Sequence, residues 1–455
     1  MNLPKEVVYI LERFKEFGFF AYPVGGCVRD SLLGKTPGDF DITTDATPID
    51  TLEVFKEQNT IRLGEKFGTI GVLLNENIYE ITTMRYDHDY IDSRHPSAVS
   101  FTTDLYEDLK RRDFTINAMA YDYFNDELID PFDGKLDLEK GIIRAVGDPL
   151  KRFEEDALRI MRAFRFAGRF NYVIEEKTLS SLCKSVPHLE EIAMERIREE
   201  LNKILLESGF ENLRMLYNCG VFKVLFPEID AMFKTTQNNS FHVYNVGDHS
   251  LMAVTKIKDD VRLKYVALLH DLGKVPAKTT GEDGTDHFYF HSNYSVELAR
   301  KVLNRLKFSN EDKNHILKII KFHDTVLNTK LRSIMKFVVD RGFSYEDFLD
   351  LLEMEKADIS SQNPYYIYRL ENLEKVKEAY RKVYEGPTKL SDLAVNGSDM
   401  IEIGYKGEFI KKVLQYLLKQ VIGEPKINEK EKLISIAEKV YDDICRGEWL
   451  WLRTL

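Results

Sequence analysis

Two short motifs near the amino terminus carry residue types that could bind a nucleotide. Gly25 and Gly26 begin the run Gly-Gly-Cys-Val-Arg-Asp, and Asp39 and Asp41 follow within Asp-Phe-Asp. Paired glycines let a backbone turn approach a phosphate closely, and Arg29 can neutralise the charge of that phosphate. Because Asp39 and Asp41 are two positions apart, both carboxylates would point to one face of a strand.

These residue types predict metal-assisted transfer of a nucleotide. Two hard oxygen donors beside a triphosphate cradle suit Mg²⁺. Glu80, within Tyr-Glu-Ile-Thr, is the candidate for a third carboxylate that would complete a two-metal site. Paired metals would activate an attacking hydroxyl and stabilise the leaving pyrophosphate. We therefore predict that Asp39, Asp41 and Glu80 are catalytic and that Asp39 and Asp41 bind Mg²⁺ in the active site of a nucleotidyltransferase.

A second run, Arg-Arg-Asp-Phe-Thr-Ile-Asn-Ala at 111–118, combines cations with polar groups. Arg112 can bind phosphate, and Asp113 and Asn117 could form hydrogen bonds with ribose hydroxyls. The polar residues 86–101 have no clear period, and we predict a mobile loop over the active site, since such loops often carry function.

The segment from Arg152 to Phe166 could read the base of a nucleotide. On one helix, Asp156 and Arg159 would be adjacent on a face that Arg162 and Arg165 extend towards the triphosphate or the incoming RNA end. An acceptor beside a donor complements cytosine and adenine, whereas uracil and guanine offer the reverse pattern. Because a mismatch would leave buried polar groups unpaired, the pair predicts selection of C and A.

Histidines concentrate in the second half of the chain. Seven of the ten lie between His242 and His323, around the run Leu-Leu-His-Asp-Leu-Gly-Lys that contains His270 and Asp271. An adjacent His-Asp pair, with further His and Asp residues on other helices, predicts a mixed nitrogen and oxygen site for Mn, Ni, Fe or Zn.

The local patterns predict an α+β protein. Residues 6–18 have helical periodicity, and strand-like runs follow at 21–24, 40–43, 69–74, 78–82 and near 118–121. After about residue 150 the chain reads as successive amphipathic helices. The layout is a small α/β head followed by a long all-α body.

Composition sets limits on the class of protein. The 455 residues are 44% hydrophobic and 31% charged, as expected of a globular chain, with no apolar run long enough for a membrane and no readable secretory signal. Four cysteines without a CxxC pair predict a reducing cytoplasm, and no disulfide framework or zinc knuckle. The net charge of −11 still allows nucleic-acid binding, because that needs only a local basic stripe.

Taken together, these motifs resemble the class II tRNA nucleotidyltransferases, the bacterial CCA-adding enzyme family, whose close relatives are bacterial poly(A) polymerases. The glycine turn, the Asp39/Asp41 pair and the runs at 111–118, 155–159 and 195–201 carry the resemblance. It implies a polymerase-β-like head at 1–145, a helical neck at 146–235, a body at 236–375 and a tRNA-binding tail at 376–455. It also implies that the nucleotide is bound by Gly26, Arg29, Arg112, Asp156, Arg159, Arg162 and Arg165.

The body resembles an HD phosphohydrolase domain. The resemblance assigns the core metal site to His249, His270, Asp271 and Asp358, and a second metal would suit His291 and His323. If active, such a domain would cleave phosphomonoester or 2′,3′-cyclic phosphate ends. The alternative is a degenerate domain kept as a scaffold.

The resemblance implies that the 3′-hydroxyl of tRNA attacks the α-phosphate of CTP or ATP until C, C and A have been added, in the cytoplasm and without a membrane partner. Addition of A alone or of poly(A) is the alternative within the family. From other classes, a uridylyl-transferring signalling enzyme and a non-catalytic RNA-binding protein remain. The Asp156 and Arg159 pair argues against the former and the intact Asp39 and Asp41 against the latter. The oligomeric state is left open.

Overall fold

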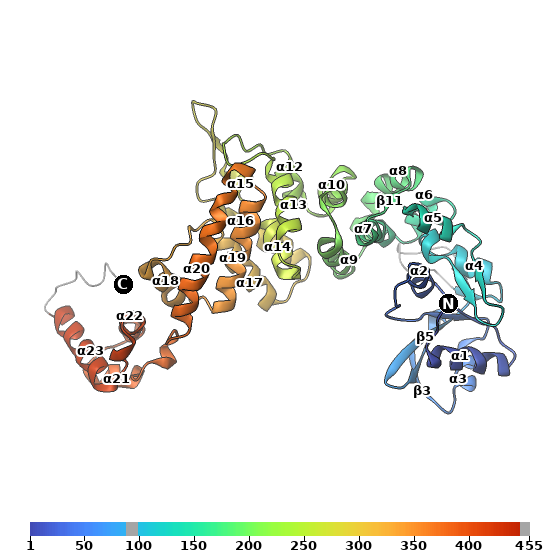
Figure 1. Cartoon of the computed structure of the whole chain (residues 1–455), viewed down its shortest axis with the longest axis horizontal. Coiled ribbons are helices and arrows are strands. Elements are labelled where there is room, and N and C mark those ends of the chain that lie inside the picture. Colours follow the sequence, from blue (N-terminus) through green and yellow to red (C-terminus); the bar gives the residue numbers. More distant parts are fainter. Residues whose placement is uncertain (88–98, 446–455) are drawn as a thin grey trace. The chain divides into compact units, whose positions relative to one another are not determined.

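The computed structural model describes residues 1–87 and 99–445. The chain forms two compact units (Figure 1): unit 1 is Met1–Asp230 with Asn304–Lys307, and unit 2 is Ala231–Leu303 with Phe308–Leu455. The predicted α+β class is confirmed, because the extended sheet lies in unit 1 and helices make up most of the remainder. The finer division into head, neck, body and tail stays a prediction.

A five-stranded sheet forms the centre of the head in unit 1, in the order β1-β2-β5-β4-β3. Strand β2 pairs antiparallel with β1 and parallel with β5, and the other pairs are antiparallel. The bounds of the strands are β1 Ala21–Pro23, β2 Ile42–Thr44, β3 Asn59–Gly64, β4 Thr69–Leu74 and β5 Asn77–Thr83.

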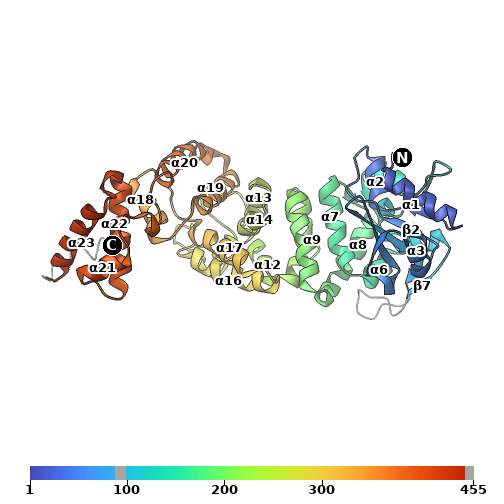
Figure 2. The same ribbon diagram turned by 90° about the horizontal axis from the view of Figure 1, so that it is seen from below.

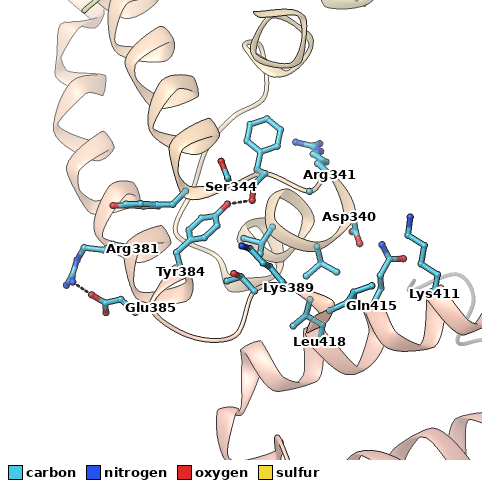
Figure 3. Close-up of a pocket in the computed structure, with 17 residues that line it drawn as sticks. Asp340, Arg341, Ser344, Arg381, Tyr384, Glu385, Lys389, Lys411, Gln415 and Leu418 are labelled. Atoms are coloured by element: carbon cyan, nitrogen blue, oxygen red, sulfur yellow. Dashed lines mark hydrogen bonds and ion pairs between the residues drawn. The ribbon is translucent and has the colours of Figure 1, made fainter. Parts of the chain in front are cut away.

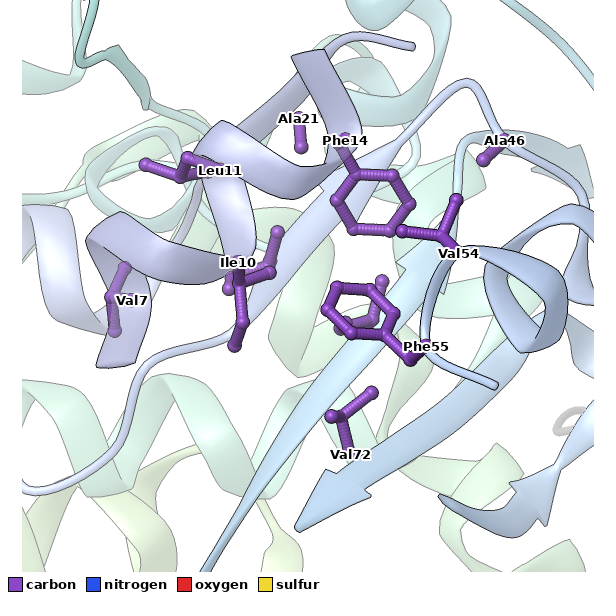
Figure 4. Close-up of a cluster of buried hydrophobic side chains, with 11 residues drawn as sticks. Val7, Ile10, Leu11, Phe14, Ala21, Ala46, Val54, Phe55 and Val72 are labelled. Atoms are coloured by element: carbon purple, nitrogen blue, oxygen red, sulfur yellow. The ribbon is translucent and has the colours of Figure 1, made fainter. Parts of the chain in front are cut away.

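Helix α1 (Lys5–Glu16) covers the sheet because its apolar residues recur at helical spacing. Val7, Ile10, Leu11 and Phe14 are all buried, and Figure 4 shows them facing the side chains that follow α3 (Pro48–Val54) and those of the sheet. The rings of Phe14 and Phe55 meet edge to face, with their centroids 5.3 Å apart. This core fixes the sheet whose edge carries the predicted carboxylates.

Short elements join the head to the helices that follow it. The predicted loop at 86–101 has paired ends, because β6 (Arg85–Asp87) and β7 (Val99–Phe101) are antiparallel; residues 88–98 lie outside the described part of the chain. The remaining bounds in unit 1 are α2 Gly26–Leu32, α4 Leu105–Lys110, β8 Ala120–Asp122, β9 Glu127–Ile129, α5 Gly134–Lys140, α6 Pro149–Glu155, α7 Leu158–Phe170, α8 Glu176–Ser185, α9 Met194–Glu207 and α10 Phe210–Asn218.

Unit 2 is built from helices, as Figure 2 also shows. Its strands among the described residues are two-residue pairs, β12 (Thr279–Thr280) and β13 (Asp286–His287). Its main helices are α13 Val246–Lys256, α14 Val261–Leu269, α16 His291–Arg305, α17 Asn310–Phe322, α19 Tyr345–Ser360, α20 Leu370–Tyr384, α21 Gly397–Ile403, α22 Glu408–Gly423 and α23 Lys430–Cys445. None of the helices described here is long and apolar enough to cross a membrane.

The cysteines depart from the prediction of an all-reduced chain. Cys183 on α8 and Cys219, which follows α10, form a disulfide in the structure. These residues are 36 positions apart, and no local spacing pattern signals such a pair. Cys27 is free and buried, and burial raises the pKa of its thiol to about 12.

Candidate active site and metal cluster

A cavity of about 660 Å³ in unit 1 brings together most of the predicted nucleotide-binding residues. Four segments contribute to its wall: the glycine turn, the segment before β2, the run that follows α4, and helix α7. Its lining includes Gly26, Arg29, Asp39, Asp41, Arg112, Asp113, Asn117, Asp156, Arg159, Arg162 and Arg165.

The glycine turn has the close approach that the sequence predicts. Gly25 has a φ of 77°, in the left-handed region, and a Cβ at this position would lie 2.8 Å from Arg112 Nη1. Helix α2 begins at Gly26, one residue later. Glycine therefore lets the backbone of the turn and the guanidinium of Arg112 share one wall of the cavity.

The Asp39 and Asp41 carboxylates lie just before β2, not within it as predicted. Both side chains are exposed to the cavity, and neither forms a salt bridge within residues 1–87 and 99–445. Asp41 is held through its backbone, because its carbonyl accepts a hydrogen bond from Val24 N at 3.0 Å. Other acidic residues of the cavity, including Asp113 and Asp156, are paired with arginines.

Glu80 lies on β5, next to this pair. Since Ile42 pairs with Ile81 in parallel register, Asp41 and Glu80 occupy equivalent positions in neighbouring chain segments. Desolvation raises the pKa of Asp41, and the charges of Asp39 and Glu80 raise it further against the opposing effect of Arg112. This concentration of negative charge fits a divalent cation, and the donors are the hard oxygens that Mg²⁺ prefers.

A buried carboxylate that the sequence analysis missed positions the two arginines after α4. Asp108 is fully buried and accepts from Arg111 Nε at 2.9 Å, while Arg112 Nη2 lies 3.4 Å away. Its spacing of three and four residues from these arginines on one helical segment was a readable signal. Their charges hold the pKa of Asp108 below its usual value despite burial.

Asp113, Asn117, Arg162 and Arg29 form one continuous network. Arg162 donates from Nε to Asp113 Oδ2 at 2.8 Å, and Asn117 Nδ2 donates to Asp113 Oδ1 at 3.1 Å. Arg29 Nη1 in turn donates to Asn117 Oδ1 at 2.5 Å. Asp113 and Asn117, predicted to contact ribose, are thus already partnered with cationic side chains of the same wall.

The single helix predicted through Asp156 and Arg159 is wrong. Asp156 is extended, with φ −143° and ψ 101°, and separates α6 from α7. Its Oδ1 accepts from the backbone of Leu158, the first residue of α7, at 3.0 Å, and its Oδ2 lies 3.3 Å from Arg196 Nη2. An Asp commonly competes with helix continuation in this way. Both Asp156 and Arg159 nevertheless line the cavity.

Arg159 and Arg165 are buried by partners outside the predicted pair. Arg159 Nη1 lies 2.7 Å from Glu155 Oε2, and its Nη2 donates to the carbonyl of Arg111 at 2.9 Å. Arg165 Nη1 donates to Glu200 Oε1 at 3.0 Å. The sequence analysis assigned no contact to Glu155 or Glu200, although Glu155 lies one helical turn before Arg159 and could have been recognised as its partner. These carboxylates fix the guanidinium groups that face the cavity.

Unit 2 contains the predicted histidine and aspartate site, here called the His/Asp cluster: His249, His270, Asp271, His291, His323 and Asp358. His249 Nε2 lies 2.8 Å from Asp358 Oδ1, and His270 Nε2 lies 3.2 Å from Asp271 Oδ2. Ligand atoms of His249, His270 and Asp358 lie within 4.8 Å of one another, as do those of His270, Asp271 and His323. The four predicted core residues therefore meet at one place, although His249 and Asp358 are 109 positions apart in the sequence.

The remaining two histidines complete the cluster. His291 Nε2 and His323 Nε2 lie 3.1 Å apart, and Asp271 Oδ1 is 3.5 Å from the former and 3.6 Å from the latter. Backbone carbonyls accept from the Nδ1 atoms of His270, His291 and His323 if these carry protons, which leaves Nε2 directed at the cluster.

The donor set of the cluster fits a divalent transition metal. His270 Nε2 and Asp271 Oδ1 are buried and have no hydrogen-bond partner within the described ranges. Unpartnered polar atoms of this kind are costly unless a ligand satisfies them. Mixed imidazole and carboxylate donors suit Mn, Fe, Ni or Zn.

A second cavity, of about 1010 Å³, lies elsewhere in unit 2 and contains none of the predicted residues. It lies between the 338–345 segment, the end of α20 and helix α22, as Figure 3 shows. Its cationic lining residues are Arg341, Arg381, Lys389 and Lys411.

Comparison with known proteins agrees with the geometry of both units. Residues 21–144 match the family model described as "Poly A polymerase head domain", residues 171–233 match "Probable RNA and SrmB- binding site of polymerase A", and residues 279–437 match "tRNA nucleotidyltransferase domain 2 putative". The fold and the cavity are those of a nucleotidyltransferase.

Individual relatives extend this similarity over the whole chain. A CCA-adding enzyme of Leuconostoc mesenteroides is 31% identical over 97% of this chain and 98% of its own length. One of Lactococcus lactis is 39% identical over 71% of this chain and 85% of its own length. The crystal structure of the Bacillus stearothermophilus CCA-adding enzyme in complex with CTP has a TM-score of 0.73 and 27% identity, covering 98% of this chain and 100% of that one. The chain belongs to the family of CCA-adding enzymes.

Proposed function

We propose that this protein adds C, C and A to the 3′ end of tRNA, using CTP and ATP without a nucleic-acid template. One observation carries the proposal: two unpaired carboxylates face a cavity whose other wall is lined with arginines. The similarity to CCA-adding enzymes, one of them crystallised with CTP, supports the choice of substrates. We place the protein in the cytoplasm, because tRNA is its substrate.

In this proposal each part of the cavity has a chemical task. Asp39 and Asp41 would hold Mg²⁺, which when bound would supply the charge that lowers the pKa of the attacking 3′-hydroxyl and neutralises the phosphates. The turn at Gly25 and Gly26 admits the triphosphate, and the nearby guanidinium of Arg112 binds it. The 3′-hydroxyl gives up its proton to water and its oxygen bonds to the α-phosphorus, while the bond from that phosphorus to the oxygen bridging to the β-phosphate breaks, so that pyrophosphate leaves.

The remaining residues select and hold the nucleotide. Asp156 and Arg159 read the base as acceptor and donor, once Arg196 and Glu155 have fixed their positions. Arg162 and Arg165 extend the positive wall for the triphosphate or the RNA end. Asp113, Asn117 and Arg29 hold this wall in shape, and the oxygens of Asp113 and Asn117 offer their remaining lone pairs to ribose hydroxyls.

Removal of a metal ligand tests the proposal. We expect Asp39→Asn or Asp41→Asn to reduce incorporation of CTP by at least roughly 1,000-fold, because the charge that holds the metal is lost. Binding of CTP in the absence of metal, measured by equilibrium dialysis, should change little. Glu16→Gln, an exposed carboxylate on α1, is the matched control. Full activity of the Asp39 and Asp41 variants would contradict the proposed role of the carboxylates.

We propose a second activity for unit 2, hydrolysis of phosphoesters at the His/Asp cluster. His270 Nε2 and Asp271 Oδ1 support it, because both atoms are buried and neither forms a hydrogen bond within the described residues. We expect the protein to bind about one or two transition-metal ions, and His270→Ala to lose that binding. Metal content measured by mass spectrometry and phosphatase activity after loading with Mn, Ni, Fe or Zn test the proposal. Metal binding without hydrolysis would favour the scaffold alternative.

A further inference from the structure

Four exposed aromatic rings lie on chain segments that contact the His/Asp cluster. We call them the rim rings: Phe241, Tyr289, Phe290 and Tyr365. Large exposed rings are normally costly to leave in water, and a group of them beside a polar site requires a reason. The three segments that carry them are bonded to the cluster and, in two cases, to each other.

The first segment contains Phe241. Lys274, which lies 2.7 Å from Asp271 Oδ2, donates to Gln237 Oε1 at 2.7 Å, and its Nζ is 3.5 Å from His242 Nε2. The ring of His242 meets that of His249 edge to face, at a centroid distance of 4.9 Å. The residue next to Phe241 is therefore in contact with the cluster.

The second segment contains Tyr289 and Phe290. Phe290 is 78% exposed and has a φ of 57°, a left-handed conformation that a bulky residue rarely adopts. The next residue is His291, whose Nδ1 lies 2.9 Å from the carbonyl of Phe288. The fold thus holds a strained, exposed ring immediately beside a member of the cluster, and such strain is concentrated at functional sites.

The third segment contains Tyr365, which is 77% exposed. It begins at the cluster, because Gln362 Nε2 donates to Asp358 Oδ2 at 2.7 Å. It is tied to the first segment, because Asn363 N donates to the carbonyl of Phe241 at 2.8 Å and the rings of Phe241 and Tyr366 lie 4.4 Å apart.

We propose that the rim rings stack an unpaired nucleobase at the end of an RNA strand whose terminal phosphoester enters the His/Asp cluster. This inference rests on the hydrolytic function proposed for the cluster, and it names the class of substrate. Aromatic side chains bind single-stranded bases by stacking, whatever the base. A folded protein partner is a poorer fit, since the three residues before Phe241 are polar: Asn238, Asn239 and Ser240.

The proposed reaction is hydrolysis of the phosphoester by water. For a terminal 2′,3′-cyclic phosphate, the oxygen of water bonds to phosphorus, one ribose oxygen leaves phosphorus, and that oxygen takes up the proton released by water. No oxidant or co-reactant is needed. The rim rings take no part in bond breaking; they are specificity residues that position the base.

A fluorescent nucleotide separates stacking from hydrolysis. The probe is the 2′,3′-cyclic phosphate of 2-aminopurine riboside, which has no free 3′-hydroxyl for the head to extend, with saturating CTP to occupy the head. We expect metal-loaded wild-type protein to quench its fluorescence on mixing. Phe290→Ala and Tyr365→Ala should weaken binding about tenfold, and Phe290→Trp should restore it. Phe20→Ala, an exposed ring of the head, is the matched control.

A substrate without a base completes the test. Hydrolysis of glycerol 1,2-cyclic phosphate, which has neither a base nor an aromatic ring, should be unchanged in the rim variants, whereas hydrolysis of the cyclic nucleotide should show a raised KM and an unchanged kcat. Equal effects on both substrates, or quenching that survives loss of the rings, would overturn the inference while leaving the hydrolase intact. Quenching that depends on the rings in a protein with no hydrolytic activity would overturn the proposed hydrolase and leave the base-binding rim.

Discussion

Arg162 binds one carboxylate oxygen of Asp113 through two of its nitrogens. Its Nε and Nη2 lie 2.8 Å and 2.5 Å from Asp113 Oδ2, across 49 positions of sequence. The contact joins helix α7 to the run that follows α4. Because Asp113 also accepts from Asn117, which is bonded to Arg29, one ion pair sets the positions of four residues of the cavity wall.

The ion pair between Arg162 and Asp113 predicts that the protein loses a defined part of its folding stability in acid. Burial opposes ionisation of Asp113, but Arg162 and Asn117 outweigh it and lower its pKa from 3.8 to about 2. A carboxylate whose pKa is lower in the folded than in the unfolded protein stabilises the fold at any pH above its pKa in the unfolded protein. This stabilisation is lost as pH falls from about 4 towards 2. Its full value is about 2 kcal/mol. Asp113→Asn should remove that part of the pH dependence in urea unfolding followed from pH 6 to pH 2.5.

The control for the urea unfolding of Asp113→Asn is Asp133→Asn, which changes an exposed carboxylate of the same unit. It should keep the acid profile of the parent protein. If Asp113→Asn also keeps it, the ion pair does not stabilise the cavity wall.

Asp156 should determine which bases are accepted. Asp156→Ala removes the acceptor for the exocyclic amine of cytosine and adenine, and it releases Arg196. We expect the preference for CTP over UTP, measured as a ratio of kcat/KM, to fall roughly tenfold or more, because one buried hydrogen bond is lost. The neighbouring exposed Glu154→Gln should keep the preference. An unchanged ratio in the Asp156 variant would mean that other groups read the base.

Much of this site was predictable from local patterns. The helical period of Val7, Ile10 and Phe14 predicts α1, and the glycine turn and acidic pair identify the cavity. The partners of the cavity residues were not predictable, because Arg162 and Asp113, or Arg165 and Glu200, meet only in the folded chain. The same holds for the Cys183–Cys219 disulfide.

Two errors had local physical causes. The helix through Asp156 was predicted from side-chain spacing alone, whereas the side chain of Asp156 accepts from Leu158 N and so ends one helix and starts the next. Strand β3 was not among the predicted strands: Ile61 and Leu63 alternate with polar residues, but the run is short and its side chains are mostly exposed at the sheet edge.

His315 should make unit 2 less stable in mild alkali. Asp347 and Asp350 raise its pKa from 6.5 to about 9, against burial and the charge of Arg262. Lys318 also faces this site, 2.6 Å from Asp347. A histidine whose pKa is raised on folding gives stabilisation that is complete below about pH 6.5 and is lost as pH rises through about 9. The loss is roughly 3 kcal/mol at most.

We expect His315→Gln to flatten the fall in thermal midpoint between pH 7 and pH 9.5. His188→Gln, which changes an exposed histidine beside Glu191, should leave that fall as it is in the parent protein. An identical fall in all three proteins would show that the charge of His315 does not stabilise unit 2.

The cationic cavity of unit 2 should contact the phosphate backbone of tRNA. Lys389→Ala and Lys411→Ala should each weaken tRNA binding and reduce the slope of log K against log salt concentration by about 1, because each removes one phosphate contact. Filter binding at several salt concentrations measures this slope. Lys301→Ala, on the exposed face of α16, is the control, and binding of CTP should not change. Slopes equal to that of the control would exclude this cavity from the RNA interface.

Incorporation of nucleotides into defined tRNA transcripts tests the central claim most directly. Labelled CTP, ATP and UTP are offered, separately and together, to transcripts that end before CCA, after C and after CC. The account predicts that CTP is used on the first two transcripts, that ATP is used only on the third, and that UTP is refused. Use of ATP alone on the third transcript would identify an A-adding enzyme, and long A tails a poly(A) polymerase. Transfer of UTP without CTP would contradict base selection by Asp156 and Arg159.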